Sequence, residues 1–204
     1  TSNVELPARL NQHAMVDIDG AAVCVVCDSH TGEAGFDLIV PLPAFTKIAR
    51  KLTDAGQSYS AAWVGENAQD ILRVEAGIPR YGSDFTEDNL LLEVGLDDAV
   101  SFTKGCYLGQ EVVERIRSRG HVNRRLCGLV IDGETPAAPG SVIEAAGKPV
   151  GAVTSSVVSP QLKQPIALAY LNKDAWTPGD EVSVRSGPSS SRATVAPLPF
   201  VRSS

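Results

Sequence analysis

An apolar run of strand length occupies Arg125–Ile131 (RLCGLVI) and ends in the turn dipeptide Asp132-Gly133. Similar runs follow at short intervals, at Ser141–Ala145, Val150–Val158, Ile166–Leu171, Glu181–Arg185 and Ala193–Pro197. Glycine- and proline-containing turns separate these runs, for example Pro139-Gly140 and Pro178-Gly179. Short strands at this spacing predict a small antiparallel β-barrel or β-sandwich over residues 121–204.

The sequence pattern before residue 120 is different, because strand-like and helix-like segments alternate there. Strands are expected at Val16–Val26, Gly35–Val40 and Tyr59–Val64. One-sided apolar spacing predicts helices over residues 44–55, with Gly56 as the C-cap, and over residues 66–76. The alternation indicates an α/β lobe over residues 1–120, so the chain as a whole is expected to be α+β.

Composition excludes several classes of protein. The chain has 204 residues, of which 43% are hydrophobic and 21% are charged, and a formal net charge of −6. These values argue against wholesale disorder, and no apolar run reaches the roughly 20 residues that a membrane helix needs. The start of the chain lacks both a methionine and the basic, then apolar, pattern of a signal peptide. We therefore expect a cytoplasmic protein without a membrane anchor.

The four cysteines, Cys24, Cys27, Cys106 and Cys127, are too few and too scattered for a secreted disulfide framework. Cys24 and Cys27 form a CxxC pattern, but it lies inside an expected strand. Side chains three positions apart on a strand point to opposite faces, so a shared metal ion would require a break in the strand. We interpret both as small core residues and assign no metal ligand.

Basic residues gather in residues 101–130, where lysine and arginine outnumber acidic residues by 6 to 2. The basic members are Lys104, Arg115, Arg117, Arg119, Arg124 and Arg125. A basic patch on an acidic protein suits a polyanionic partner, such as RNA, a polyglutamate tail or an acidic protein. The alternative is that these arginines pair with local carboxylates or with the acidic stretch at residues 84–98.

The segment Lys104–Arg117 (KGCYLGQEVVERIR) places a cysteine just before an expected short helix that starts near Gly109. A nearby lysine and a helix N-terminus both stabilise a thiolate. Cys106 is therefore a candidate functional thiol, and the positive charge of Lys104 would stabilise its thiolate form. Tyr107 and Gln110 offer stacking and amide hydrogen bonds to a flat heterocycle. The alternatives are that Cys106 is a buried small residue and that its neighbours only shape the turn.

Several motifs resemble one known family. KGCYLGQE at residues 104–111 looks like the signature of the YgfZ folate-binding proteins, relatives of the glycine-cleavage T-protein, an aminomethyltransferase. Residues 119–126 (RGHVNRRL) and the ending Pro197–Phe200 are also similar to YgfZ members. Residues 31–37 (TGEAGFD) and 70–79 (DILRVEAGIP) resemble motifs that both branches share.

The resemblance implies a ring of three lobes around a folate site: two α/β lobes and a C-terminal barrel. The first lobe, roughly a third of a family member, has no counterpart before Thr1, and we interpret the chain as a shortened member. In the T-protein that part carries the catalytic aspartate, so no residue here takes its role. The implied cofactor is tetrahydrofolate or a derivative.

The resemblance also implies roles for single residues. Asp37 stands where the T-protein has a glutamate that binds the pterin ring, and a carboxylate can accept a pair of N–H bonds there. Glu33, in the same loop, is a weaker candidate that could also only cap the turn. Gln69 replaces an arginine that meets the folate tail, and it keeps hydrogen bonding but loses the charge.

These roles lead to three expected functions. The first is a YgfZ-like folate-binding protein that supports iron–sulfur cluster assembly or repair through Cys106, with iron–sulfur proteins as partners. The second is a tetrahydrofolate-dependent aminomethyltransferase, against which Gln69 and the Cys106 motif count. The third is a role in tRNA modification, with weak RNA binding through the arginine cluster.

Overall fold

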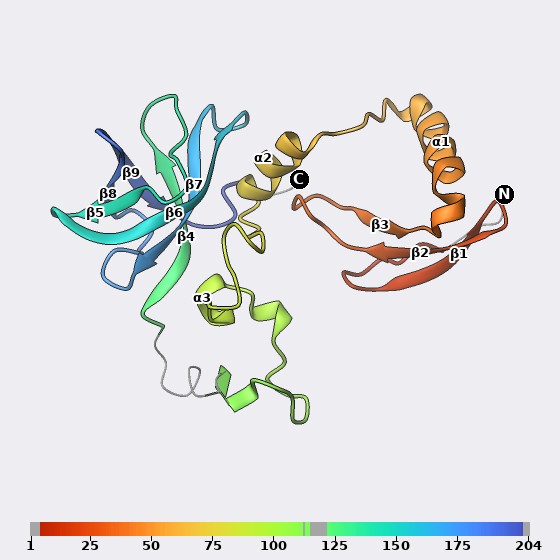
Figure 1. Ribbon diagram of the computed structural model, residues 1–204, viewed down its shortest axis with the longest axis horizontal. Helices are drawn as coiled ribbons and strands as arrows, with labels where there is room; N and C mark the ends of the chain where they lie inside the picture. Colours follow the sequence, from red (N-terminus) through yellow and green to blue (C-terminus); the bar gives the residue numbers. More distant parts are fainter. Residues whose placement is uncertain (1–4, 112, 115–121, 202–204) are drawn as a thin grey trace. The chain divides into compact units, whose positions relative to one another are not determined.

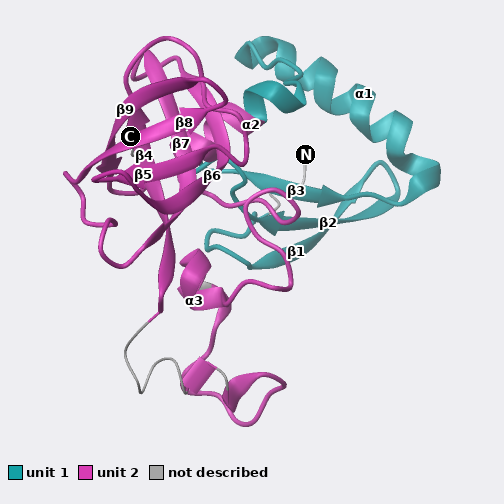
Figure 2. Ribbon diagram, turned by 60° about the vertical axis from the view of Figure 1, so that its left-hand side comes forward, with its two compact units in different colours: residues 1–69, 203 teal, residues 70–202, 204 magenta. Residues whose placement is uncertain are grey.

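The computed structural model describes residues 5–111, 113–114 and 122–201. The chain divides into two compact units between Gln69 and Asp70 (Figure 2). The described residues of the range 70–123, which precede the barrel, therefore belong to the same unit as the barrel. The sequence pattern, by contrast, changes from alternating strands and helices to short strands only near residue 120. Each unit has its own core.

The first unit is a three-stranded antiparallel sheet in the order β1-β2-β3, with a helix on one face (Figure 1). Its elements are β1 (His13–Ile18), β2 (Ala21–Cys27), β3 (Phe36–Ile39), the 3-10 turns η1 (Leu42–Ala44) and η2 (Gln57–Tyr59), and α1 (Phe45–Gly56). Val16, Val23 and Val25 point to one face and pack against Ile48 of α1. The predicted helix and the strand at Gly35–Val40 are confirmed.

Two details of this unit differ from the prediction. The single strand expected at Val16–Val26 is a hairpin, because Asp19 (φ 53°) and Gly20 (φ 82°) form a tight turn of the kind that left-handed residues favour. The strand expected at Tyr59–Val64 is absent: the chain leaves α1 through η2, and Ser60, with φ 56°, takes the left-handed conformation expected of Gly56. Side chains here are exposed and meet no partner strand.

The second unit is built on a closed antiparallel barrel in the order β4-β7-β6-β5-β8-β9. Its strands are β4 (Arg124–Ile131), β5 (Val142–Ala145), β6 (Lys148–Ser159), β7 (Gln164–Asn172), β8 (Glu181–Ser186) and β9 (Ser189–Ala196). All six predicted strands are confirmed, as is the α+β class. Alternate residues, such as Leu129, Ala169 and Val195, fill the interior because strand side chains alternate in direction.

A second cluster covers the outer face of the barrel. There Leu126, Leu168 and Tyr170 pack with Val74 of α2 (Glu66–Glu75) and Val94 of α3 (Leu91–Val94). A 3-10 turn, η3 (Asp97–Ala99), follows α3. Strand β7 is buried on both faces, which explains why its sequence is continuously apolar instead of alternating.

Buried polar groups join α2 to the barrel. Arg73 donates hydrogen bonds to Asp84 (Nη1 to Oδ2, 2.5 Å), to Ser155 of β6 (Nη2 to Oγ, 2.7 Å) and to Asp70 (Nε to Oδ1, 2.7 Å). The Asp84 side chain is fully buried, and it also accepts from Thr154 Oγ1 at 2.5 Å. The Arg73 guanidinium therefore compensates a carboxylate that has lost its water.

No helix in the part of the chain that the structure describes is long and apolar enough to cross a membrane.

Candidate functional site

The loop between β2 and β3 presents a carboxylate at the edge of the first unit. Asp37 is the second residue of β3 and pairs across the sheet with Val26. Its side chain is 46% exposed, so part of its surface faces water. Glu33, at the tip of the same loop, is exposed, and its carbonyl oxygen accepts a hydrogen bond from Ser29 Oγ (2.6 Å). The Asp37 carboxylate, at the start of β3, lies against a polar side chain of this loop.

That polar side chain is His30, a residue that the sequence prediction did not include. His30 Nε2 lies 3.0 Å from each oxygen of Asp37 and 3.7 Å from Oδ2 of Asp28. The hydrogen bond to Asp37, followed by the negative charges of Asp37 and Asp28, raises the pKa of His30 above its ordinary value of 6.5. No periodic pattern signals this contact, because the two residues are seven positions apart across an irregular loop.

Gln69 lies in the first turns of α2 and is exposed, with its amide group available to a ligand. Its backbone N–H donates to Gly65 O at 3.2 Å, as expected near a helix start.

The segment around Cys106 belongs to the second unit. Cys106 is exposed, so the alternative that it is a buried small residue is wrong. Lys104 Nζ lies 4.8 Å from the centre of the Tyr107 ring, a cation–π distance, and the Gln110 backbone donates to Tyr107 O (3.2 Å). The described residues Gln110, Glu111, Val113 and Glu114 are helical, in line with the predicted helix. The role of Lys104 in stabilising a thiolate stays a prediction.

Lys104 and Tyr107 line a pocket of about 380 Å³ together with residues 89–92. The Tyr107 hydroxyl is buried and has no hydrogen-bond partner among the described residues. Cys106 and Gln110 are not among the lining residues, so the pocket and the exposed thiol are neighbouring but separate features.

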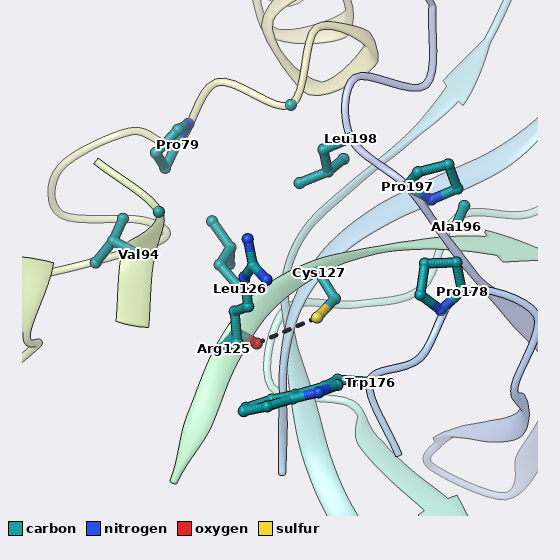
Figure 3. A pocket seen from close by; sticks show the side chains of 12 residues that line it. Pro79, Val94, Arg125, Leu126, Cys127, Trp176, Pro178, Ala196, Pro197 and Leu198 are labelled. Atoms are coloured by element: carbon teal, nitrogen blue, oxygen red, sulfur yellow. Dashed lines mark hydrogen bonds between the residues drawn. The ribbon is translucent and has the colours of Figure 1, made fainter. Parts of the chain in front are cut away.

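A second pocket, of about 390 Å³, opens at one end of the barrel (Figure 3). Trp176, Leu198 and Cys127 line it, and Arg125 is the one charged residue among its described lining. Burial raises the pKa of Cys127 to about 11, and its thiol lies 3.5 Å from the Arg125 carbonyl oxygen. Cys127 is therefore a protonated core residue, and the described lining residues of this pocket include no acid–base pair.

The structure describes only some of the basic residues that gather in residues 101–130. Arg115, Arg117 and Arg119 lie outside the described residues. Arg124 Nε pairs with Glu93 Oε2 at 3.0 Å, and the Arg124 guanidinium covers the Tyr170 ring at 5.2 Å. The alternative of pairing with the acidic stretch is thus confirmed for Arg124, whereas Arg125 is exposed.

Cys24 and Cys27 are half-buried on opposite faces of β2. This confirms that the CxxC pattern does not bring two thiols together.

Comparison with known proteins identifies the group to which this architecture belongs. Residues 5–104 match the model of the GCVT N-terminal domain, and residues 124–202 match that of the glycine cleavage T-protein C-terminal barrel domain. The chain belongs to the glycine cleavage T-protein superfamily. Membership accounts for the order of the two folds, and it supports the superfamily predicted from the motifs without singling out its YgfZ branch.

The relatives within the T-protein superfamily agree with each other in name. The chain is 35% identical over 199 residues to a protein of a Nostoc species called aminomethyltransferase, covering 97% of this chain and 52% of the relative. An aminomethyltransferase of Rubrobacter xylanophilus is also 35% identical, over 186 residues, covering 91% of this chain and 48% of the relative. The chain thus spans about half the length of these relatives.

A solved T-protein structure is similar over almost the whole chain. The crystal structure of the glycine cleavage system aminomethyltransferase T from Bartonella henselae superposes with a TM-score of 0.84 at 27% identity. The match covers 98% of this chain and 54% of that one. The T-protein architecture therefore extends through both units of this chain.

Proposed function

We propose that this chain forms part of the tetrahydrofolate site of an aminomethyltransferase, the second of the three expected functions. The names of the relatives favour this function over the YgfZ-like one. The observation that carries the proposal is the exposed carboxylate of Asp37, held at the start of β3 in a motif that resembles the T-protein pterin loop.

The hydrogen-bond acceptors of the Asp37 carboxylate match the donors of the proposed ligand. An aminopyrimidine ring edge presents two parallel N–H donors, and an ionised carboxylate accepts a pair of such bonds. Asp37 would orient the pterin, and the exposed amide of Gln69 would meet the polar tail more weakly than an arginine does. When bound, tetrahydrofolate would supply the amine that accepts the one-carbon unit.

The test is a calorimetric titration of 5-formyltetrahydrofolate into the chain and into Asp37→Asn. The substitution keeps the size of the side chain but replaces one acceptor oxygen with a donor, so we expect a loss of affinity of about tenfold or more. Asp54→Asn is the matched control, because Asp54 is an exposed aspartate of α1 in the same unit. Equal binding by the Asp37 and Asp54 variants would refute the pterin contact, and no binding by the folded wild type would refute the folate site.

The exposed thiol of Cys106 favours a second candidate function, the support of iron–sulfur proteins. One cysteine cannot hold a cluster as four cysteines do, but an exposed thiolate can bind a cluster transiently as its cargo. In cells that lack the complete protein, Cys106→Ala should then abolish complementation, whereas Cys24→Ala should not. Full complementation by Cys106→Ala would refute this function.

A further inference from the structure

The β2–β3 loop is closed on itself, and this closure holds His30 beside the Asp37 carboxylate. Asp28 N donates to Gly35 O at 3.3 Å, and Ser29 N donates to Asp28 Oδ1 at 2.7 Å. A Cβ atom at Gly35 would come within 2.9 Å of Asp28 O, so a side chain there would force the two arms of the loop apart. The position of His30 is therefore a consequence of the loop's own hydrogen bonds.

The His30 ring nitrogen stands in front of the whole carboxylate group. Because Nε2 is 3.0 Å from both Oδ1 and Oδ2, it lies in the plane midway between the two oxygens, within hydrogen-bond distance of each. A donor with two N–H groups, one bonded to each oxygen, must also straddle this plane within hydrogen-bond distance of both oxygens. The imidazole and an aminopyrimidine edge cannot both occupy that position.

We propose that the His30 imidazole competes with the pterin ring for the Asp37 carboxylate. In the free protein His30 occupies the face of Asp37 that would bind the pterin, and the ligand displaces it on binding. This inference rests on the proposed function, since it takes Asp37 as the pterin contact. Displacement is feasible because the His30 side chain is 54% exposed and belongs to a loop, so the ring can turn into water.

The competition depends on pH. A protonated His30 binds the Asp37 carboxylate as an ion pair, and a neutral one only as a hydrogen-bond donor. Among the described residues, the charged groups that face the His30 ring are Asp37 and Asp28. Asp28 and Asp37 both favour the protonated ring in the free protein. Binding must therefore release a proton, and folate affinity should rise as the pH rises through the raised pKa of His30.

The experiment is a titration with 5-formyltetrahydrofolate at about pH 5.5 and about pH 8.5, on either side of the ordinary histidine pKa. Wild-type affinity should rise roughly two- to fivefold with pH, the range set by an exposed ion pair. His30→Ala should bind more tightly than wild type at the lower pH and lose most of the pH dependence. His13→Ala, which removes an exposed histidine of the same sheet, should behave as wild type.

The two ways of failing are distinguishable. If wild type and His30→Ala bind with the same affinity and the same pH dependence, the competition is refuted while the folate site stands. If neither protein binds at either pH, while both are folded, the folate site itself is refuted, and the inference with it.

Discussion

At the residue scale, the two cysteines of the second unit lie in opposite environments, so they should react very differently. Cys106 is exposed, whereas Cys127 is 7% exposed and burial raises its pKa to about 11. At about pH 8 only about one Cys127 side chain in a thousand would be a thiolate.

Iodoacetamide at this pH should therefore modify Cys106 at least about tenfold faster than Cys127. Mass spectrometry of peptides from a time course measures both rates in one sample. Cys24 and Cys27, which are half-buried, should fall between these two and serve as internal references. Modification of Cys127 at the rate of Cys106 in the folded protein would contradict the burial of Cys127.

At the residue scale, a motif can name a candidate residue from sequence, but the role of that residue stays a prediction. The TGEAGFD motif pointed to Asp37, which the structure places at an accessible position in β3. The contact with His30 could not be predicted, because it depends on how an irregular loop closes and not on any repeat in spacing.

At the element scale, the Arg73 network should contribute more to stability than any exposed ion pair. The Arg73 and Asp84 side chains are 5% and 0% exposed, and Arg73 → Met would leave Asp84 buried without its cation. Removing one partner of a buried pair costs about 3–5 kcal/mol of unfolding free energy. Chemical denaturation of the two proteins measures this difference.

Arg185→Met is the matched control. Arg185 pairs with Glu144 at 2.9 Å on the barrel surface, where its side chain is 51% exposed, so its loss should cost at most about 1 kcal/mol. The double variant Arg73→Met/Asp84→Leu should recover part of the stability that Arg73→Met loses, because the uncompensated charge is gone. Equal losses in Arg73→Met and Arg185→Met would show that the buried network is not what holds α2 to the barrel.

Elements were predictable from sequence to the extent that each carried its own boundary signals. The six barrel strands were predicted because Gly and Pro turns separate them, and α1 because its apolar face is periodic. The β1–β2 hairpin was missed although its signal, Asp19-Gly20, was present, because apolar residues continue on both sides of it. The strand expected at Tyr59–Val64 failed because β-forming residues make a strand only beside a partner.

At the scale of the whole molecule, the two units have separate hydrophobic cores, and this predicts separate local stabilities. Ile48, 1% exposed, anchors the core of the first unit, and Ile143, fully buried, is part of the barrel interior. Each substitution to alanine removes buried methyl groups and leaves a cavity, which costs about 2–5 kcal/mol. The loss should be confined to the unit that contains the cavity, because each unit has its own hydrophobic core and cooperative units can open independently.

Amide hydrogen exchange on the complete chain measures this directly, since each variant serves as the control for the other. Ile48→Ala should accelerate exchange in β1, β2 and β3 and leave β7 protected as in wild type. Ile143→Ala should do the reverse, because β7 is buried on both faces within the barrel unit. If either variant accelerated exchange equally in both sets of strands, the two cores would have to unfold as one cooperative unit.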